Sequence, residues 1–188
     1  MKMLKDIATV KAGHSFRGAI NEDLSGNGYV IQVRNQRECG EIAWDELVRA
    51  QIPGLKEPEW LREGDIIFSA RGPRNIATAI KNVDRPTVCS PHFFVISLSQ
   101  PHALPEFIAW QLNHKNAQNY LRRAAEGSAQ VSIRRTVLES VSIALPPLKK
   151  QKQIMQFVAA AKEEQQLLNQ LIENRERQLV AIANDILK

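Results

Sequence analysis

The side chains of this chain that could do chemistry are mostly arginines outside the predicted helices and strands. A guanidinium is a planar fork of donors that fits phosphate oxygens and the edge of guanine better than an ammonium does. The net charge of +5 adds a mild preference for polyanions. These arginines fall in predicted loops and at element ends: Arg34, Arg37, Arg71, Arg74, Arg85, Arg122, Arg123, Arg134 and Arg135.

Two loops combine arginine with amide side chains. The run Arg34-Asn35-Gln36-Arg37 follows a predicted strand and offers Arg for guanine and Asn or Gln for adenine. Arg71, Arg74 and Asn75 surround a Gly72-Pro73 turn that would project them. We expect these loops to read bases, and we expect phosphate contacts from a second set, although any one of them could be an ordinary solvated charge. The second set is Arg17, Lys81, Arg85, Arg134 and Arg135.

Signatures of catalysis are missing from the sequence. There is no phosphate-binding Gly-rich loop, no nucleophile elbow and no zinc motif. The four histidines are scattered, and Cys39 and Cys89 fit a reducing cytoplasm without offering metal-ligand spacing. Pro146-Pro147 lacks the preceding Asn or Asp and the following aromatic residue of an amino-methyltransferase. We therefore expect a binding protein without cofactor or metal, and an enzyme that uses His92 is the weakest alternative.

Length and patterning predict one mixed domain with an appendage. The chain has 188 residues and 44% hydrophobic residues, and it has no apolar run near the ~18 residues that a membrane span needs. Strands are expected at 29–33, 66–70, 76–80, 93–98 and 141–145, a helix at 105–125, and a helix or strand at 4–10. Residues 40–58 read as an irregular connection. Because strands and helices do not alternate regularly, the expected class is α+β with a curved, mainly antiparallel sheet.

Residues 151–187 read as one helix with a heptad seam. No Gly or Pro interrupts the run, and eight of the ten seam positions are apolar. At ~1.5 Å per residue this helix is roughly 55 Å long. Gln165 and Arg175 interrupt the seam, either to fix the register or because the seam is partly solvated. The seam consists of Ile154, Val158, Ala161, Gln165, Leu168, Ile172, Arg175, Leu179, Ile182 and Ile186.

Five segments of the sequence stand out by their order and spacing. They are Gly64-Asp65-Ile66-Ile67-Phe68-Ser69-Ala70-Arg71-Gly72, Ser90-Pro91-His92-Phe93-Phe94-Val95-Ile96, Leu104 to Asn113, Gly127-Ser128-Ala129-Gln130 and Leu145-Pro146-Pro147-Leu148. Together they resemble one known family, the specificity subunits of type I restriction-modification systems, and the resemblance covers nearly the whole chain. His92, Gln130 and Ser132 lie within or next to these segments, and either DNA contact or a structural role would explain them.

The resemblance implies a DNA-reading target recognition domain at 1–148 and a conserved spacer helix at 149–188. Members usually carry two such units in tandem, whereas this chain has one. A self-complementary helix could pair with a second copy as an antiparallel homodimer. Its partners would then be double-stranded DNA and methyltransferase subunits. The DNA site would be a split palindrome with half-sites about one to one and a half turns apart. A restriction subunit could join. The competing interpretation is a coiled-coil adaptor with no role on DNA.

Overall fold

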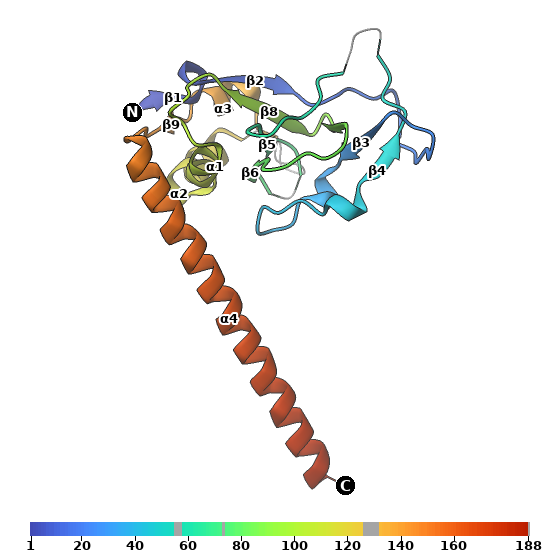
Figure 1. Cartoon of the computed structure of the whole chain (residues 1–188), viewed down its shortest axis with the longest axis vertical. Coiled ribbons are helices and arrows are strands. Elements are labelled where there is room, and N and C mark those ends of the chain that lie inside the picture. The colour runs from blue at the N-terminus through green and yellow to red at the C-terminus, as the bar shows by residue number, and fades with distance from the viewer. Residues whose placement is uncertain (55–57, 73, 126–131, 188) are drawn as a thin grey trace. The chain divides into compact units, whose positions relative to one another are not determined.

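The computed structural model describes residues 1–54, 58–72, 74–125 and 132–187. The chain divides into two compact units, Met1–Leu148 and Lys149–Lys188. Figure 1 shows the first as a mixed α+β body and the second as a single long helix. The expected α+β class is confirmed, since the strand pairs are antiparallel with one exception among the described strands.

The main sheet of the first unit has four antiparallel strands. Its order is β2 (Ala8–Ala12), β8 (Phe93–Leu98), β5 (Ile66–Ser69) and β6 (Ala77–Ala79). The strand predicted at 93–98 is central, and β6 is the hairpin mate of β5, as the Gly72-Pro73 turn predicts. Phe93 and Ile96 of β8 are buried, whereas Ser97 is exposed.

A second sheet of three strands contains the parallel pair. Its order is β4 (Val48–Ala50), β3 (Gly28–Ile31) and β7 (Thr87–Cys89), with β3 and β7 parallel. Neither β4 nor β7 is predicted from the sequence, and β4 lies inside the segment expected to be irregular. The strand expected at 141–145 is the short β9 (Ser142–Ile143), which pairs with β1 (Lys2–Met3).

The prediction of one helix over 105–125 is wrong. The segment forms α1 (Pro105–Asn113) and α2 (Lys115–Ala124), separated at His114, whose φ and ψ of −72° and 150° are extended. A shorter helix, α3 (Arg135–Glu139), precedes β9. Single 3₁₀ turns lie at Leu4–Asp6, Val33–Asn35 and Trp44–Glu46. Residues 4–10 therefore hold both a helical turn and the start of β2.

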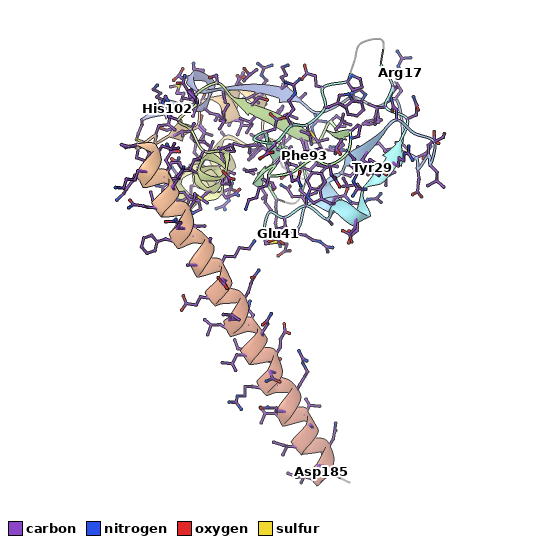
Figure 2. The ribbon with its side chains drawn as sticks, in the orientation of Figure 1. Arg17, Tyr29, Glu41, Phe93, His102 and Asp185 are labelled. Carbon is purple, nitrogen blue, oxygen red and sulfur yellow. The ribbon has the colours of Figure 1, made fainter. Side chains whose placement is uncertain are left out.

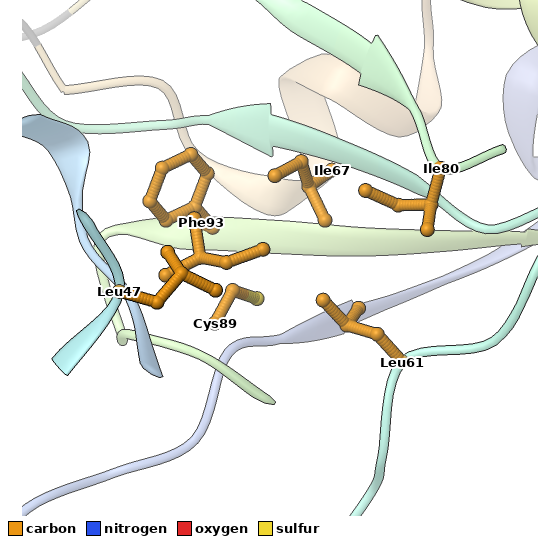
Figure 3. Packing of buried hydrophobic residues seen from close by; sticks show 7 residues of the cluster. Leu47, Leu61, Ile67, Ile80, Cys89 and Phe93 are labelled. Carbon is orange, nitrogen blue, oxygen red and sulfur yellow. The ribbon is translucent and has the colours of Figure 1, made fainter. Parts of the chain in front are cut away.

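One cluster of the core of the first unit joins the two sheets. Phe93 and Ile67 of the four-stranded sheet pack with Leu47, Leu61, Ile80, Cys89 and Ile31, and all are buried (Figure 3). Burial of a large apolar side chain stabilises by roughly 1.5–3 kcal/mol. This cluster therefore fixes the two sheets against each other and sets where the loops at their ends emerge.

The second unit is α4 (Leu148–Ile186), a helix of 39 residues. At ~1.5 Å per residue it is about 58 Å long. It begins directly after Pro146-Pro147, because the residue before a proline disfavours the helical region. Its apolar side chains include Leu168, Ile172, Leu179 and Ile182, and each is about half to two-thirds exposed. No described helix is long and apolar enough to cross a bilayer.

Candidate nucleic-acid interface

One end of the four-stranded sheet gathers several of the predicted DNA-contacting residues. The register pairs Ser69, the last residue of β5, with Phe93, the first residue of β8. The loops before and after these residues must therefore leave the sheet together. Backbone N–H groups of Ala70 and Arg71 donate to the carbonyl oxygen of His92 at 2.8 and 3.2 Å. Arg71 and His92, both exposed, thus lie at the same end.

The start of α3 joins this end through backbone contacts. Ser132 forms an antiparallel bridge with Arg71, and the N–H of Ile133 donates to the carbonyl of Ala70 at 2.9 Å. Arg134 and Arg135 follow at once and are exposed. Arg135 pairs with Glu139 at 2.7 Å. Two predicted phosphate contacts are thereby placed next to the loop that carries Arg71.

The loop from β5 to β6 is closed by its own polar side chains. The Ser69 hydroxyl accepts from the N–H of Ile76 and donates to the carbonyl of Arg74, each at 2.8 Å. Asn75 Nδ2 donates to the carbonyl of Ser69 at 2.8 Å. The turn itself needs Gly72, because its φ of +138° lies in the region that L side chains avoid. These bonds tie the backbone of Arg74 and Ile76 to Ser69, which lies two residues before Arg71.

The second predicted loop docks on β6, so the two loops form one surface. Gln36 Nε2 donates to Thr78 Oγ1 at 2.8 Å and to the carbonyl of Ile76 at 3.2 Å. Thr78 Oγ1 in turn donates to the carbonyl of Gly40 at 2.7 Å. Across the same junction, Arg74 pairs with Glu38.

Three amide side chains that are predicted to read bases form hydrogen bonds within the protein instead. Asn35 is only 1% exposed; its Oδ1 accepts from the N–H of Gln32 at 2.8 Å and its Nδ2 donates to the carbonyl of Glu46 at 3.1 Å. Gln36 and Asn75 are engaged as described above. In this conformation the three amides position the loops instead of presenting donors to a base. Arg34 is exposed beside them, and Arg37 pairs with Glu46 at 2.6 Å.

The remaining predicted contacts are dispersed. Arg17 comes four residues after Gly13, whose N–H donates to the carbonyl of Phe93 at 2.8 Å, so the chain leaves β2 at the sheet end where Arg71 lies. Lys81 follows β6 and therefore lies at the opposite end. Arg85 stacks over the Tyr29 ring, 4.5 Å from its centroid, and donates to the carbonyl of Trp44 at 3.0 Å. In Figure 2, Arg17 and Tyr29 lie at one end of the first unit and His102 at the other.

Gln130 lies outside the described residues. Within the described ranges, no three His, Cys, Asp or Glu side chains gather as metal ligands would. Burial raises the pKa of the Cys89 thiol to about 12, so this thiol stays protonated at neutral pH. The exposed arginines of this surface supply hydrogen-bond donors and positive charge for binding an anion.

Sequence reasoning did not single out the side chains that hold this surface. Asn113 is the last residue of α1. Its Oδ1 accepts from the N–H of Ala77 and its Nδ2 donates to the carbonyl of Ala77, each at 2.8 Å. The amide therefore forms the bonds that a neighbouring strand would form at the edge of β6. Gln118 of α2 donates to the carbonyl of Asn75 at 2.9 Å. The only signal for Ser69 and Asn113 was their place in the segments that resemble the known family.

Among the solved structures that share this fold are two subunits of restriction-modification systems. One is the S subunit of a type I restriction-modification system from M. genitalium, with a TM-score of 0.57 and 16% identity over 92% of this chain and 41% of that chain. The other is the HsdS subunit from Thermoanaerobacter tengcongensis, with a TM-score of 0.59 and 16% identity over 87% of this chain and 37% of that chain. This chain thus spans well under half of each of those subunits. No curated protein matches it.

An α+β body followed by a long helix is therefore the fold of these specificity subunits. A sequence model described as the type I restriction modification DNA specificity domain matches residues 1–175. The chain belongs to that family, and the resemblance seen in its sequence is confirmed.

Proposed function

We propose that this protein is the non-catalytic DNA-recognition subunit of a type I restriction-modification complex. Its first unit reads double-stranded DNA, and α4 pairs with a second copy and docks methyltransferase subunits. The observation that supports this proposal most directly is that exposed cationic side chains lie together at one end of the four-stranded sheet. Arg71 is held there by backbone contacts to His92 and Ser132, and Arg134 directly follows Ile133, whose N–H donates to the carbonyl of Ala70.

The chemistry of this surface supports DNA over a small anion. Its cations come from several loops, which suits a long polyanion contacted at many phosphates. Arginine forks fixed on hydrogen-bonded loops can also read guanine edges. Arg34 and Arg71 are the proposed base readers, whereas Arg17, Arg134 and Arg135 are the proposed phosphate contacts. Lys81 is left out, because it lies at the opposite sheet end.

The exposed apolar side chains of α4 support pairing with another helix. A stripe that includes Leu168, Ile172, Leu179 and Ile182 would be costly to leave in water. Antiparallel pairing with a second copy would place two identical recognition units at opposite ends of the rod. Both units would then read the same half-site, so the target would be a split palindrome. The polar seam residues Gln165 and Arg175 have partners on their own helix, Asn169 and Gln178.

The test is to map the sites of DNA methylation across a whole genome. The chain is expressed with the methyltransferase subunit of its own host in a strain without DNA methylation, and modified adenines are mapped by long-read sequencing. A split palindromic motif that disappears without this chain is the expected result. A split but asymmetric motif would mean that a different recognition unit completes the complex, which contradicts the homodimer. Absence of any motif, together with absence of duplex binding, would favour the coiled-coil adaptor.

A further inference from the structure

A groove of about 570 Å³ lies beside β6 in the first unit. It lies between the turn at residues 37–41, the β5–β6 loop and α2. Its lining includes Glu38, Arg74, Ile76, Asn113, Gln118 and Arg122. The groove therefore borders the candidate nucleic-acid interface on the side of α2, a region that the proposed contacts do not include.

The uncharged polar groups of the groove are already used. Both ends of the Asn113 amide are bonded to Ala77. Gln118 Nε2 donates to the carbonyls of Asn75 and Leu112 at 2.9 and 2.7 Å. They shape the groove but have few donors left for a ligand. Among the described lining residues, the charged groups are Glu38, Arg74 and Arg122.

Arg74 and Glu38 form a solvent-accessible ion pair. Their side chains are 53% and 78% exposed. The hydrogen bond from Arg74, followed by its positive charge, lowers the pKa of the Glu38 carboxyl, and the same bond raises the pKa of Arg74. Glu38 therefore stays ionised at neutral pH. Because water reaches both partners, another anion can replace the carboxylate with little rearrangement.

Arg122 is the other cation of the groove. Its Nη1 lies 3.5 Å from Asn119 Oδ1, which is the limit of a hydrogen bond. It is exposed and is carried by α2, whereas Arg74 is carried by the loop. Two guanidinium groups on separate elements facing one groove are suited to hold a phosphate between them.

We infer that this groove binds a phosphodiester of the DNA backbone between Arg74 and Arg122, and that Glu38 occupies the phosphate position on Arg74 until DNA displaces it. The inference rests on the proposed function. Glu38 then acts as an internal competitor: it weakens binding to any duplex, so that only a complex with additional base contacts forms readily. Glu38 is therefore a residue that limits the strength of backbone binding and touches no base.

The experiment measures binding of a fluorescent random-sequence duplex by anisotropy between 50 and 200 mM NaCl, with the full chain. Variants are Glu38→Gln, Arg122→Gln and the matched control Glu59→Gln. Glu59 also forms an exposed ion pair, with Lys11 at 2.6 Å, but Lys11 is on β2 at the far edge of the sheet. Both Glu→Gln changes raise the net charge by the same amount, so long-range attraction is matched.

The Glu38→Gln variant should bind random duplex more tightly than Glu59→Gln, because no carboxylate has to leave Arg74 before the phosphate binds. One additional phosphate contact changes the logarithmic salt slope by about 0.9, or about 3.5-fold in affinity over a fourfold change in salt. Arg122→Gln should lower the slope by about the same amount. Equal behaviour of the two Glu→Gln variants, or an unchanged slope for Arg122→Gln, would overturn the inference while the proposed function stands. Failure of the wild-type chain to bind any duplex would overturn the proposed function and the inference with it.

Discussion

Replacing Ser69 with alanine should loosen the loop that presents Arg71 and Arg74. The Ser69 side chain is 1% exposed, and its hydroxyl satisfies the N–H of Ile76 and the carbonyl of Arg74 at 2.8 Å each. Alanine keeps the backbone and removes one oxygen. The substitution therefore leaves one backbone donor and one backbone acceptor without these partners.

The magnitude follows from how well water can replace that oxygen. A buried group left without a partner costs about 1–3 kcal/mol, whereas a group that water reaches costs much less. Ser69 itself is buried, but Arg74 is exposed, so its carbonyl can be hydrated more easily. We expect a loss of about 2 kcal/mol in the free energy of unfolding, which corresponds to a fall in Tm of roughly 4–8 °C for a unit of this size.

Urea denaturation followed by tryptophan fluorescence measures this loss selectively. Trp44, Trp60 and Trp110 are the three tryptophans of the chain, and all lie in the first unit. The control is Ser140→Ala, because the Ser140 hydroxyl donates to a carbonyl four residues earlier at a more accessible site and should change stability by about 0.5 kcal/mol or less. If Ser69→Ala matched Ser140→Ala, the loop would be held by something other than this hydroxyl.

Three further predictions address the proposed contacts, the rod and the thiols. Arg34→Ala or Arg71→Ala should reduce discrimination between the methylome-defined site and random duplex by about 1–3 kcal/mol, and equal loss on both DNAs would contradict a base-reading role. Leu168→Pro should remove helix pairing in light scattering, since proline costs about 3 kcal/mol in a helix interior, and it should leave the fluorescence-detected transition of the first unit unchanged; a shift there would mean that the rod is part of its core. At pH 8 a disulfide reagent should label one thiol, the exposed Cys39, because the pKa of Cys89 is raised to about 12 by burial; Cys89 should react only in urea, and two reactive thiols in the folded chain would contradict this.

Local patterns were sufficient to predict three strands of the central sheet and the rod. The apolar run at 93–98 and the Gly72-Pro73 turn each act within a few residues, and β8, β5 and β6 form where they indicate. The rod begins within a few residues of the expected start, because Pro146-Pro147 ends the preceding segment and no later residue opposes a helix. In these elements the chain's own periodicity determines the structure.

Contacts between distant segments determine what could not be predicted. The break at His114 involves neither Gly nor Pro, and the neighbouring Asn113 is bonded to Ala77, which lies 36 residues away. Likewise β7 has only three residues and pairs in parallel with β3, far from it in sequence. A strand so short shows no recognisable period of its own.

The candidate interface shows the same limit. Residue type correctly indicates what a side chain can bind, but not whether the fold has already used it. The amides of Asn35 and Gln36 have the donors and acceptors that could bind adenine. In the fold, however, they donate hydrogen bonds to the carbonyl of Glu46 and to the hydroxyl of Thr78. Only the folded structure shows that Arg34 is exposed, whereas the neighbouring amide of Asn35 is buried and hydrogen-bonded.

The pairing of β1 with β9 has a consequence for synthesis on the ribosome. Lys2 pairs with Ile143, so β1 must wait for nearly the last residues of its unit before it can pair. Until then the buried side chain of Leu4 and the backbone edge beside it have no cover, since the N–H of Leu4 donates to the carbonyl of Val141. Until residue 143 has left the ribosome, the nascent chain would expose an apolar, unpaired edge, and only then can β1 pair with β9 and close the unit.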